Sequence, residues 1–181
     1  MRPGSRPSTD GAFQLQCPDC DHVYSYTTVP PSAVEGVDEA TLLDRIAQYN
    51  RHTMWAHAHR VCPICANGTT SEFISGEEAW TAGSHRLDVF YHTHCDHCGN
   101  NHYMSVGLAL LFHPALVSFF YERGRDVTTT PHWHFEFGMT DDFTAVRSTD
   151  PWEVAVTVTA DGDELELVVD DDLTVIEENR S

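Results

Sequence analysis

The sequence predicts an α+β fold: a zinc ribbon with a long helix, a second broken helix and a C-terminal antiparallel β-meander. Three observations support this prediction. Two Cys-x-x-Cys motifs, Cys62/Cys65 and Cys95/Cys98, flank a segment with the character of two strands. Apolar residues recur at helical spacing within residues 38–58, and from residue 131 the apolar period changes to two, the period of a strand.

The paired cysteines predict a structural zinc site. A Cys-x-x-Cys turn can direct two thiolates at one ion, and a hairpin, expected here from strands at 70–74 and 85–94, can bring a second such turn opposite the first. Because four thiolates close a tetrahedral site, we expect Zn2+ to be structural and held by Cys62, Cys65, Cys95 and Cys98. Gly99 allows the positive φ needed just after the second pair.

A third pair, Cys17 and Cys20, is the second candidate for metal binding, with unknown partners. The six cysteines fall into three pairs of identical spacing, which favours metal binding over a disulfide framework. Two thiolates cannot close a tetrahedral site alone, so this pair stays free, recruits His22 or another histidine, or takes ligands from a second chain. We expect free thiols in an isolated monomer. A thioredoxin-like role is disfavoured, because residues 22–28 have the pattern of a strand rather than a helix.

Two helical regions are expected before residue 130. Asp38 is the expected N-cap of a helix of about five turns that reaches Ala58. Residues 103–124 are nearly all apolar but contain Pro114. The proline predicts a break near 112–113 and a new helix that begins at Pro114 and ends with Gly124 as its C-terminal cap.

The C-terminal part is expected to be an acidic antiparallel meander. Asp161-Gly162 is a strong hairpin turn signal, and strands are expected at 134–138, 143–147, 152–159, 164–169 and 173–177. From residue 141 onward the chain holds 13 acidic residues and 2 arginines, a net charge of −11 out of −18. The predicted organisation is a disordered tail at 1–12, a zinc-knuckle and helical domain at 13–130, and a β region at 131–181 packed on it as one unit.

The overall charge balance indicates a habitat rather than a partner. The chain has 28 acidic and 10 basic residues, and every basic residue is an arginine. Such a surface suits a cytoplasm at molar salt, where repulsion between carboxylates is screened, and it resembles that of a haloarchaeal protein. The chain lacks an apolar run of about 18 residues and an N-terminal signal sequence, so we expect a cytoplasmic protein and no membrane partner.

Other chemistries have weaker support. Histidines at 92, 94, 97 and 102 surround the last cysteine pair and could hold or sense a second metal. Alternation, however, places His92 and His94 on one strand face, either as surface residues or as residues that support the metal ligands. The helix histidines at 52, 57 and 59 lack a His-Glu-x-x-His motif, and we interpret them as packed or solvated. No phosphate loop, nucleophile elbow or paired carboxylates are present, so we expect no catalytic residues and no enzymatic activity.

The order of several motifs resembles the region that follows the winged helix in haloarchaeal ArsR-like transcriptional regulators. The motifs are Pro30-Pro31 with Gly36 ahead of a helix, Cys62-Pro63-Ile64-Cys65, Cys95-Asp96-His97-Cys98-Gly99, His113-Pro114 followed by Phe119-Phe120, Gly124-x-Asp126, Pro131-x-Trp133 and Asp150-Pro151-Trp152. In that family an N-terminal winged helix binds DNA, and a further Cys-x-x-Cys-Gly precedes the pair that matches Cys17 and Cys20. This sequence has neither. The resemblance therefore implies a stand-alone or truncated regulatory half, without autonomous DNA binding.

These observations together predict a non-enzymatic, zinc-binding regulatory or interaction protein related to transcription regulators. Its expected partner is another protein, with a winged-helix transcription factor as the candidate. One alternative is a stand-alone metal or redox sensor that uses the Cys/His-rich knuckles. Another is an adaptor that binds a protein through the apolar segment 108–121.

Overall fold

The computed structural model describes residues 4–7, 12–16, 23–79 and 87–181. These residues form three antiparallel sheets, with the strand orders β1-β2-β3, β4-β5-β6 and β10-β9-β8-β7. The strands are β1 (Gly4–Pro7), β2 (Ala12–Gln16), β3 (Val23–Thr28), β4 (Thr70–Ser75), β5 (Val89–His94), β6 (Asn101–Met104), β7 (Thr144–Thr149), β8 (Trp152–Ala160), β9 (Asp163–Val169) and β10 (Val175–Arg180). The helices are α1 (Pro31–Val34), α2 (Glu39–Ala58), α3 (Val106–Ala109) and α4 (Pro114–Tyr121), with short 3-10 helices η1 (His132–His134), η2 (Glu136–Gly138) and η3 (Asp141–Phe143).

The predicted fold class is wrong. The described chain is mostly β, with three sheets and four α-helices, rather than a zinc ribbon with a long helix and a second broken helix. β6 follows the second cysteine pair directly and turns the expected hairpin into a three-stranded sheet. The sequence pattern places Tyr103 and Met104 in an apolar helical run, because periodicity alone does not separate a short apolar strand from a buried helix.

Two further expectations fail on short segments. Residues 134–138 were expected as a strand but form parts of the 3-10 helices η1 and η2. Gly4–Pro7 lie in the region expected to be a disordered tail, and they pair with β2 from Gly4 opposite Gln16 to Pro7 opposite Phe13. A strand held by backbone hydrogen bonds needs no apolar period of its own, so composition did not signal β1.

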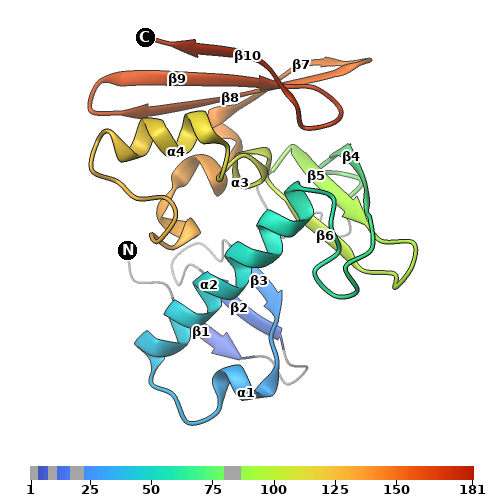
Figure 1. Ribbon diagram of the computed structural model, residues 1–181, viewed down its shortest axis with the longest axis vertical. Helices are drawn as coiled ribbons and strands as arrows, with labels where there is room; N and C mark the ends of the chain where they lie inside the picture. Colours follow the sequence, from blue (N-terminus) through green and yellow to red (C-terminus); the bar gives the residue numbers. More distant parts are fainter. Residues whose placement is uncertain (1–3, 8–11, 17–22, 80–86) are drawn as a thin grey trace.

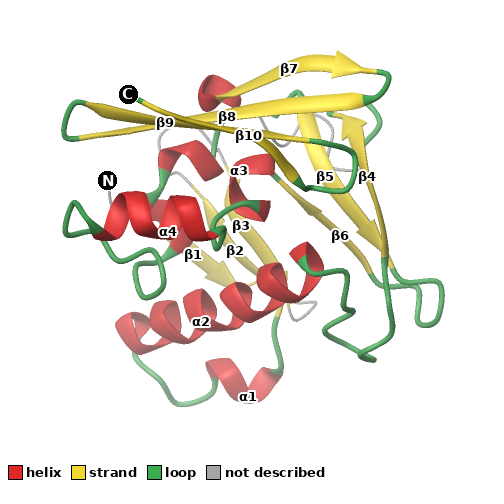
Figure 2. Cartoon of the chain, turned by 45° about the horizontal axis from the view of Figure 1, so that its top comes forward, coloured by secondary structure: helices red, strands yellow, loops and turns green. Residues whose placement is uncertain are grey.

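The three sheets lie around the helices in layers. Figure 1 shows the C-terminal sheet at the top, with α4 and α3 beneath it, and the N-terminal sheet with α1 at the bottom. Helix α2 runs diagonally from the N-terminal sheet toward β6, and Figure 2 shows the same helix along the front of the N-terminal sheet. The long helix therefore connects the N-terminal sheet to the sheet that carries the cysteine pairs.

Helix α2 begins as its sequence predicts. The Asp38 carboxylate accepts a hydrogen bond from the backbone N–H of Thr41 at 3.0 Å, which satisfies one of the free donors of the first turn. Its buried Ile46 packs with Phe13 and Leu15 of β2 in a small separate core. The buried amide of Asn50 donates to Ser25 Oγ of β3 at 2.8 Å, so a polar contact also fixes the helix on this sheet.

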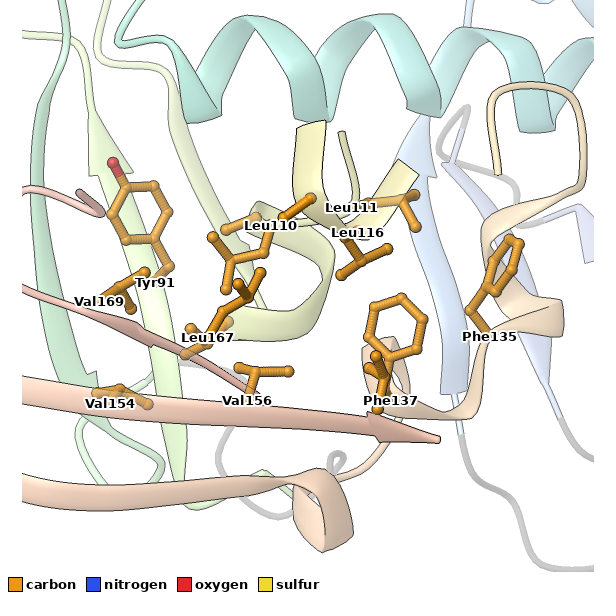
Figure 3. Close-up of a cluster of buried hydrophobic side chains, with 14 of the residues drawn as sticks. Tyr91, Leu110, Leu111, Leu116, Phe135, Phe137, Val154, Val156, Leu167 and Val169 are labelled. Atoms are coloured by element: carbon orange, nitrogen blue, oxygen red, sulfur yellow. The ribbon is translucent and has the colours of Figure 1, made fainter. Parts of the chain in front are cut away.

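The main core joins the C-terminal sheet to the helices and to β5. Figure 3 shows these side chains meeting between the C-terminal strands and the α3–α4 segment. Labelled members of the cluster are Tyr91, Leu110, Leu111, Leu116, Phe135, Phe137, Val154, Val156, Leu167 and Val169. The C-terminal meander is present as predicted, and Asp161 and Gly162 both adopt positive φ in the β8–β9 turn, as a type I′ hairpin requires.

The apolar segment after β6 is broken at the proline. Helix α4 carries Pro114 in its first turn, and the ring of His113 caps it by accepting from the N–H of Ala115. Gly124 follows with φ +70°, which a residue with a Cβ adopts at a cost. Leu116, Phe119 and Phe120 are almost fully buried, so this segment belongs to the core.

Candidate metal centre

The two cysteine pairs have the same backbone conformation. In each knuckle the first cysteine donates its N–H to the carbonyl five residues later, Cys62 to Asn67 at 2.8 Å and Cys95 to Asn100 at 2.9 Å. The carbonyl of the same cysteine accepts from the N–H four residues later, at 2.8 Å in both cases. The two turns are thus equivalent cradles, each able to present two sulfurs on one side.

The residue four positions after each first cysteine has positive φ. Gly99 has φ +74°, as the sequence predicted, and Ala66 holds the equivalent position in the first knuckle with φ +59°. Alanine is strained there because its Cβ crowds the backbone in this conformation. The pairing of Val61 with Gly68 closes the first turn, whereas β5 and β6 close the second.

The structure brings the four predicted cysteines together. Cys62 Sγ lies 3.6 Å from Cys98 Sγ, and Cys65 Sγ lies 3.6 Å from Cys95 Sγ. All four sulfurs lie within 4.8 Å of one another, and the four thiols are free. A tetrahedral ion with bonds of about 2.3 Å places its sulfurs roughly 3.8 Å apart. The cluster is therefore close enough to hold a metal ion.

Burial and local dipoles differ across the cluster. Cys62 and Cys95 are buried, Cys65 is half-buried and Cys98 is exposed. Burial raises the pKa of the Cys62 thiol, but hydrogen bonds from the backbone N–H groups of Cys65 and Ile64 and contacts with the sulfurs of Cys98 and Cys65 outweigh this effect and lower the pKa to about 7. At Cys98 the backbone N–H of Asn100 lowers the pKa, while partial loss of hydration and the three neighbouring cysteine sulfurs raise it to about 12. Four thiolates at this spacing repel one another, and a bound cation would remove that repulsion.

The sequence carries a second local signal for this pairing, beyond the Cys-x-x-Cys spacing itself. Both knuckles read Cys-x-x-Cys, then a small residue, then asparagine: Ala66-Asn67 in one and Gly99-Asn100 in the other. The small residue takes the positive φ, and the asparagine carbonyl closes the turn. Cys20 is followed by Asp21 and His22 instead, so the local pattern alone separates the two matching pairs from the third.

The other predicted ligands have different outcomes. Cys17 and Cys20, the second candidate pair, lie outside the described residues, as does His22. His92 and His94 do point to one face of β5, where both rings contact Asn101 Oδ1 at 3.0 Å. His92 also contacts Glu72, and His94 contacts Asp96. Among the described residues, the four cysteines are the only His/Cys/Asp/Glu group of three or more close enough to share an ion.

The histidine at the end of α2 supports the second knuckle. His57 is fully buried, and its Nδ1 contacts Thr93 Oγ1 at 2.7 Å while its Nε2 contacts Asn100 Nδ2 at 3.3 Å. Burial lowers its pKa to about 4, so the ring is neutral at pH 7. The amide of Asn100 can then donate to Nε2, and Nδ1–H can donate to the threonine hydroxyl. The ring thereby links α2 to the loop that closes the cysteine cluster.

The fold and the cluster define a class of protein: three antiparallel sheets around a long helix, with paired cysteine knuckles that form one four-sulfur site. The chain belongs to the family DUF7351, a domain of unknown function, which matches residues 7–175. Comparison with curated proteins and with solved structures found no match. Within the described residues, no helix is both long enough and apolar enough to cross a membrane.

Proposed function

We propose that this protein is a non-enzymatic, zinc-stabilised regulatory or interaction protein that acts in transcription through another protein. The observation that carries the proposal is the cluster of four converging sulfurs at Cys62, Cys65, Cys95 and Cys98. A set of four thiolates suits zinc or iron among common biological metals. It leaves no position open for a substrate or a reactive water, so a bound zinc ion would stabilise the fold rather than catalyse a reaction.

The cluster connects parts of the chain that are far apart in sequence. The first knuckle follows α2 directly, and the second joins β5 to β6. A shared ion would therefore fix the end of α2 against the β4-β5-β6 sheet, in addition to the contacts that His57 makes. The resemblance of the motif order to the regulatory half of ArsR-like regulators supports a role in transcription, with a winged-helix protein as the partner.

The two alternatives have less support. The sensor hypothesis needs histidines that share an ion with the cysteines, yet among the described residues no histidine belongs to a group that could hold a metal ion. His92 and His94 instead contact Glu72, Asn101 and Asp96. The adaptor hypothesis requires that the segment 108–121 is exposed and can bind another protein. That segment is mostly in the core, although Tyr121 is 71% exposed.

Metal analysis and binding assays test the proposal in two stages. Elemental analysis of protein purified without added metal should return zinc rather than iron, bound at Cys62, Cys65, Cys95 and Cys98. The chain should shift its promoter DNA only when the winged-helix partner is present, and the Cys65→Ser variant should lose this effect. Selective DNA binding by the chain alone, or a four-sulfur site that loads iron instead, would contradict the proposal.

A further inference from the structure

A cavity of about 280 Å³ lies beside the cysteine cluster, between β3, α2, β6 and the two knuckles. These elements meet around the C-terminal half of α2 (Figure 1). The volume is near the lower end of the range for small-molecule sites, roughly 300–1,000 Å³. Protein interiors are normally packed without large voids. Neither the fold nor the metal centre requires a space of this size, so the cavity calls for another explanation.

Both knuckles contribute to the wall of the cavity. Pro63 and Ile64, which lie between the first two cysteines, line it on one side. Asn100 and Asn101, which follow the last cysteine, line it on another. The backbone of Asn100 closes the second knuckle and its side chain contacts His57, which also lines the cavity. The shape of the cavity therefore depends on the turns that hold the cysteines.

The described lining of the cavity carries no formally charged side chain, although the protein is highly charged. The chain has 28 acidic and 10 basic residues, but no Asp, Glu, Lys or Arg is among the described residues that line this cavity. Three histidines do line it, and burial lowers the pKa values of His57, His102 and His132 to about 4, 3 and 3. All three rings are neutral at pH 7. A charged ligand would lose its hydration here without gaining an ionic partner among the described lining residues.

The chemistry of the wall favours a flat apolar body with a small polar group. The imidazole rings of His57 and His102 stack at 4.5 Å and within 4° of parallel, and Phe90 and Tyr103 also line the space. Sulfur atoms come from three methionines, which make favourable contacts with aromatic rings: Met54, Met104 and Met139. Polar atoms come from serine and asparagine side chains. Ser25 Oγ accepts from Asn50 and keeps a hydroxyl hydrogen to donate.

The cavity is open at an apolar rim. Three large hydrophobic residues of its lining are exposed on the surface: Tyr26 at 53%, Tyr49 at 37% and Ile64 at 66%. Large apolar side chains scattered singly on a surface are ordinary, but several around one opening mark a binding site more often than chance. These residues give an apolar molecule a route from solvent into the cavity.

We propose that this cavity is a binding site for a small, uncharged aromatic molecule, which places its ring among the methionine and aromatic side chains and its polar group against the serine and asparagine side chains. The inference does not depend on the role in transcription, because it rests on the cavity alone. A regulator could use such a ligand as an effector, since the cavity shares its walls with the metal knuckles.

Matched probes of different charge test the ligand class. Benzamide is neutral, whereas benzoate and benzylamine have a similar shape with a negative or positive charge at pH 7.5. We expect benzamide to shift the amide NMR signals of residues 100–104 in the metal-loaded full chain, and to bind at least about tenfold more tightly than either charged probe, a difference of roughly 1.4 kcal/mol. The absence of shifts at about 10 mM benzamide, or equal shifts with benzoate, would overturn the proposal.

A filled cavity tests the location. Thr53 lies on α2, is half-buried and lines the cavity, so Thr53→Trp should occupy the space and weaken benzamide binding at least about tenfold. The matched control is His52→Trp, which adds the same side chain at an exposed position of the same helix outside the cavity. Unchanged binding to Thr53→Trp, with its fold and metal content retained, would place the probe elsewhere and overturn the proposal.

A second variant keeps the test decisive if Thr53→Trp does not fold. Thr28 lies at the end of β3, lines the cavity and is exposed, so Thr28→Asp should be tolerated. The new carboxylate should raise the affinity for benzylamine, which is protonated at pH 7.5, by about threefold or more relative to benzoate. An unchanged ratio of the two affinities would mean that the probes do not enter this cavity.

Discussion

The cysteine-bearing sheet and the C-terminal sheet are held together in different ways. In the C-terminal sheet, alternate residues of β8 and β9 are buried in the main core, among them Val154, Val156 and Leu167. The sheet β4-β5-β6 contributes Phe73, Val89 and Tyr91 to the same core, but its far end is formed by two tight turns whose sulfurs meet. We infer that apolar burial stabilises the first region and a metal ion stabilises the end of the second.

The difference shows how strongly each kind of sequence pattern depends on single residues. A run of alternating apolar residues is a distributed signal, and no single residue decides the outcome. A cysteine knuckle is concentrated in two residues and one positive-φ position, so one substitution should remove it. Four predictions test this contrast, from the largest expected effect to the smallest.

Loss of one thiolate should have the largest effect. We expect Cys65→Ser to lose its metal and to open the segments 61–68 and 95–101, because metal binding and local folding are coupled, with apparent energies of roughly 10–16 kcal/mol for structural zinc. Elemental analysis and hydrogen exchange would measure both effects. His97→Ser is the control, since His97 is exposed between Cys95 and Cys98 and outside the cluster. Retained metal in Cys65→Ser would remove the basis for the contrast.

Loss of a core side chain should come next. Leu167 on β9 is 1% exposed, so Leu167→Ala should lower the free energy of unfolding by about 2–5 kcal/mol through lost burial and a residual cavity. Denaturant unfolding would measure this, with Ile176→Ala as the control, because Ile176 is 47% exposed on β10. Leu167→Ala should retain its full metal content. Loss of metal would show that the two regions do not behave separately.

Acid should destabilise the chain through buried histidines. Burial lowers the pKa of His132 to about 3, against about 6.5 in the unfolded chain. Above pH 6.5 the ring is neutral in both states and contributes nothing. Below it the unfolded state binds the proton first, so stability falls as pH falls from about 6.5 toward 3. Between pH 7 and 5, His132→Phe should lose roughly 2 kcal/mol less than the native chain in urea unfolding.

The comparison of the native chain with His132→Phe also separates the protonation of His132 from the loss of metal at low pH. Cysteine protonation at pH 5 weakens metal binding in the native chain and in His132→Phe alike, so it cancels in their difference. An equal loss of stability in both would show that His132 is protonated in the folded state.

Lower salt should have the smallest effect, concentrated in the C-terminal sheet. The chain carries a net charge of −18, and the screening length grows from about 3 Å at 1 M salt to about 10 Å at 0.1 M. We expect the Tm to fall by roughly 2–4 °C over that range, equivalent to about 1 kcal/mol. Ion pairs of Arg147 with Glu166 and Glu177 oppose the repulsion locally. A Tm that does not change with salt would contradict the prediction.

The sequence by itself determined the features that depend on neighbouring residues. The Asp38 cap, the proline break before α4 and the Asp161-Gly162 turn each require a particular residue at a particular backbone position, and each is found where the sequence predicted it. The same holds for the two cysteine turns, which depend on the separation of three positions between the cysteines of each pair and on Gly99. Local geometry decides these features, so local sequence is sufficient to predict them.

Only the tertiary structure decided which parts meet. Asn101–Met104 became a strand because β5 offered a free edge, and residues 132–138 became 3-10 helices where the main core left room for Phe135 and Phe137. The cavity beside the knuckles arises from residues between 23 and 139, which no sequence period connects. Contacts between distant segments depend on the packing of whole elements, and the short periods of a sequence do not record that packing.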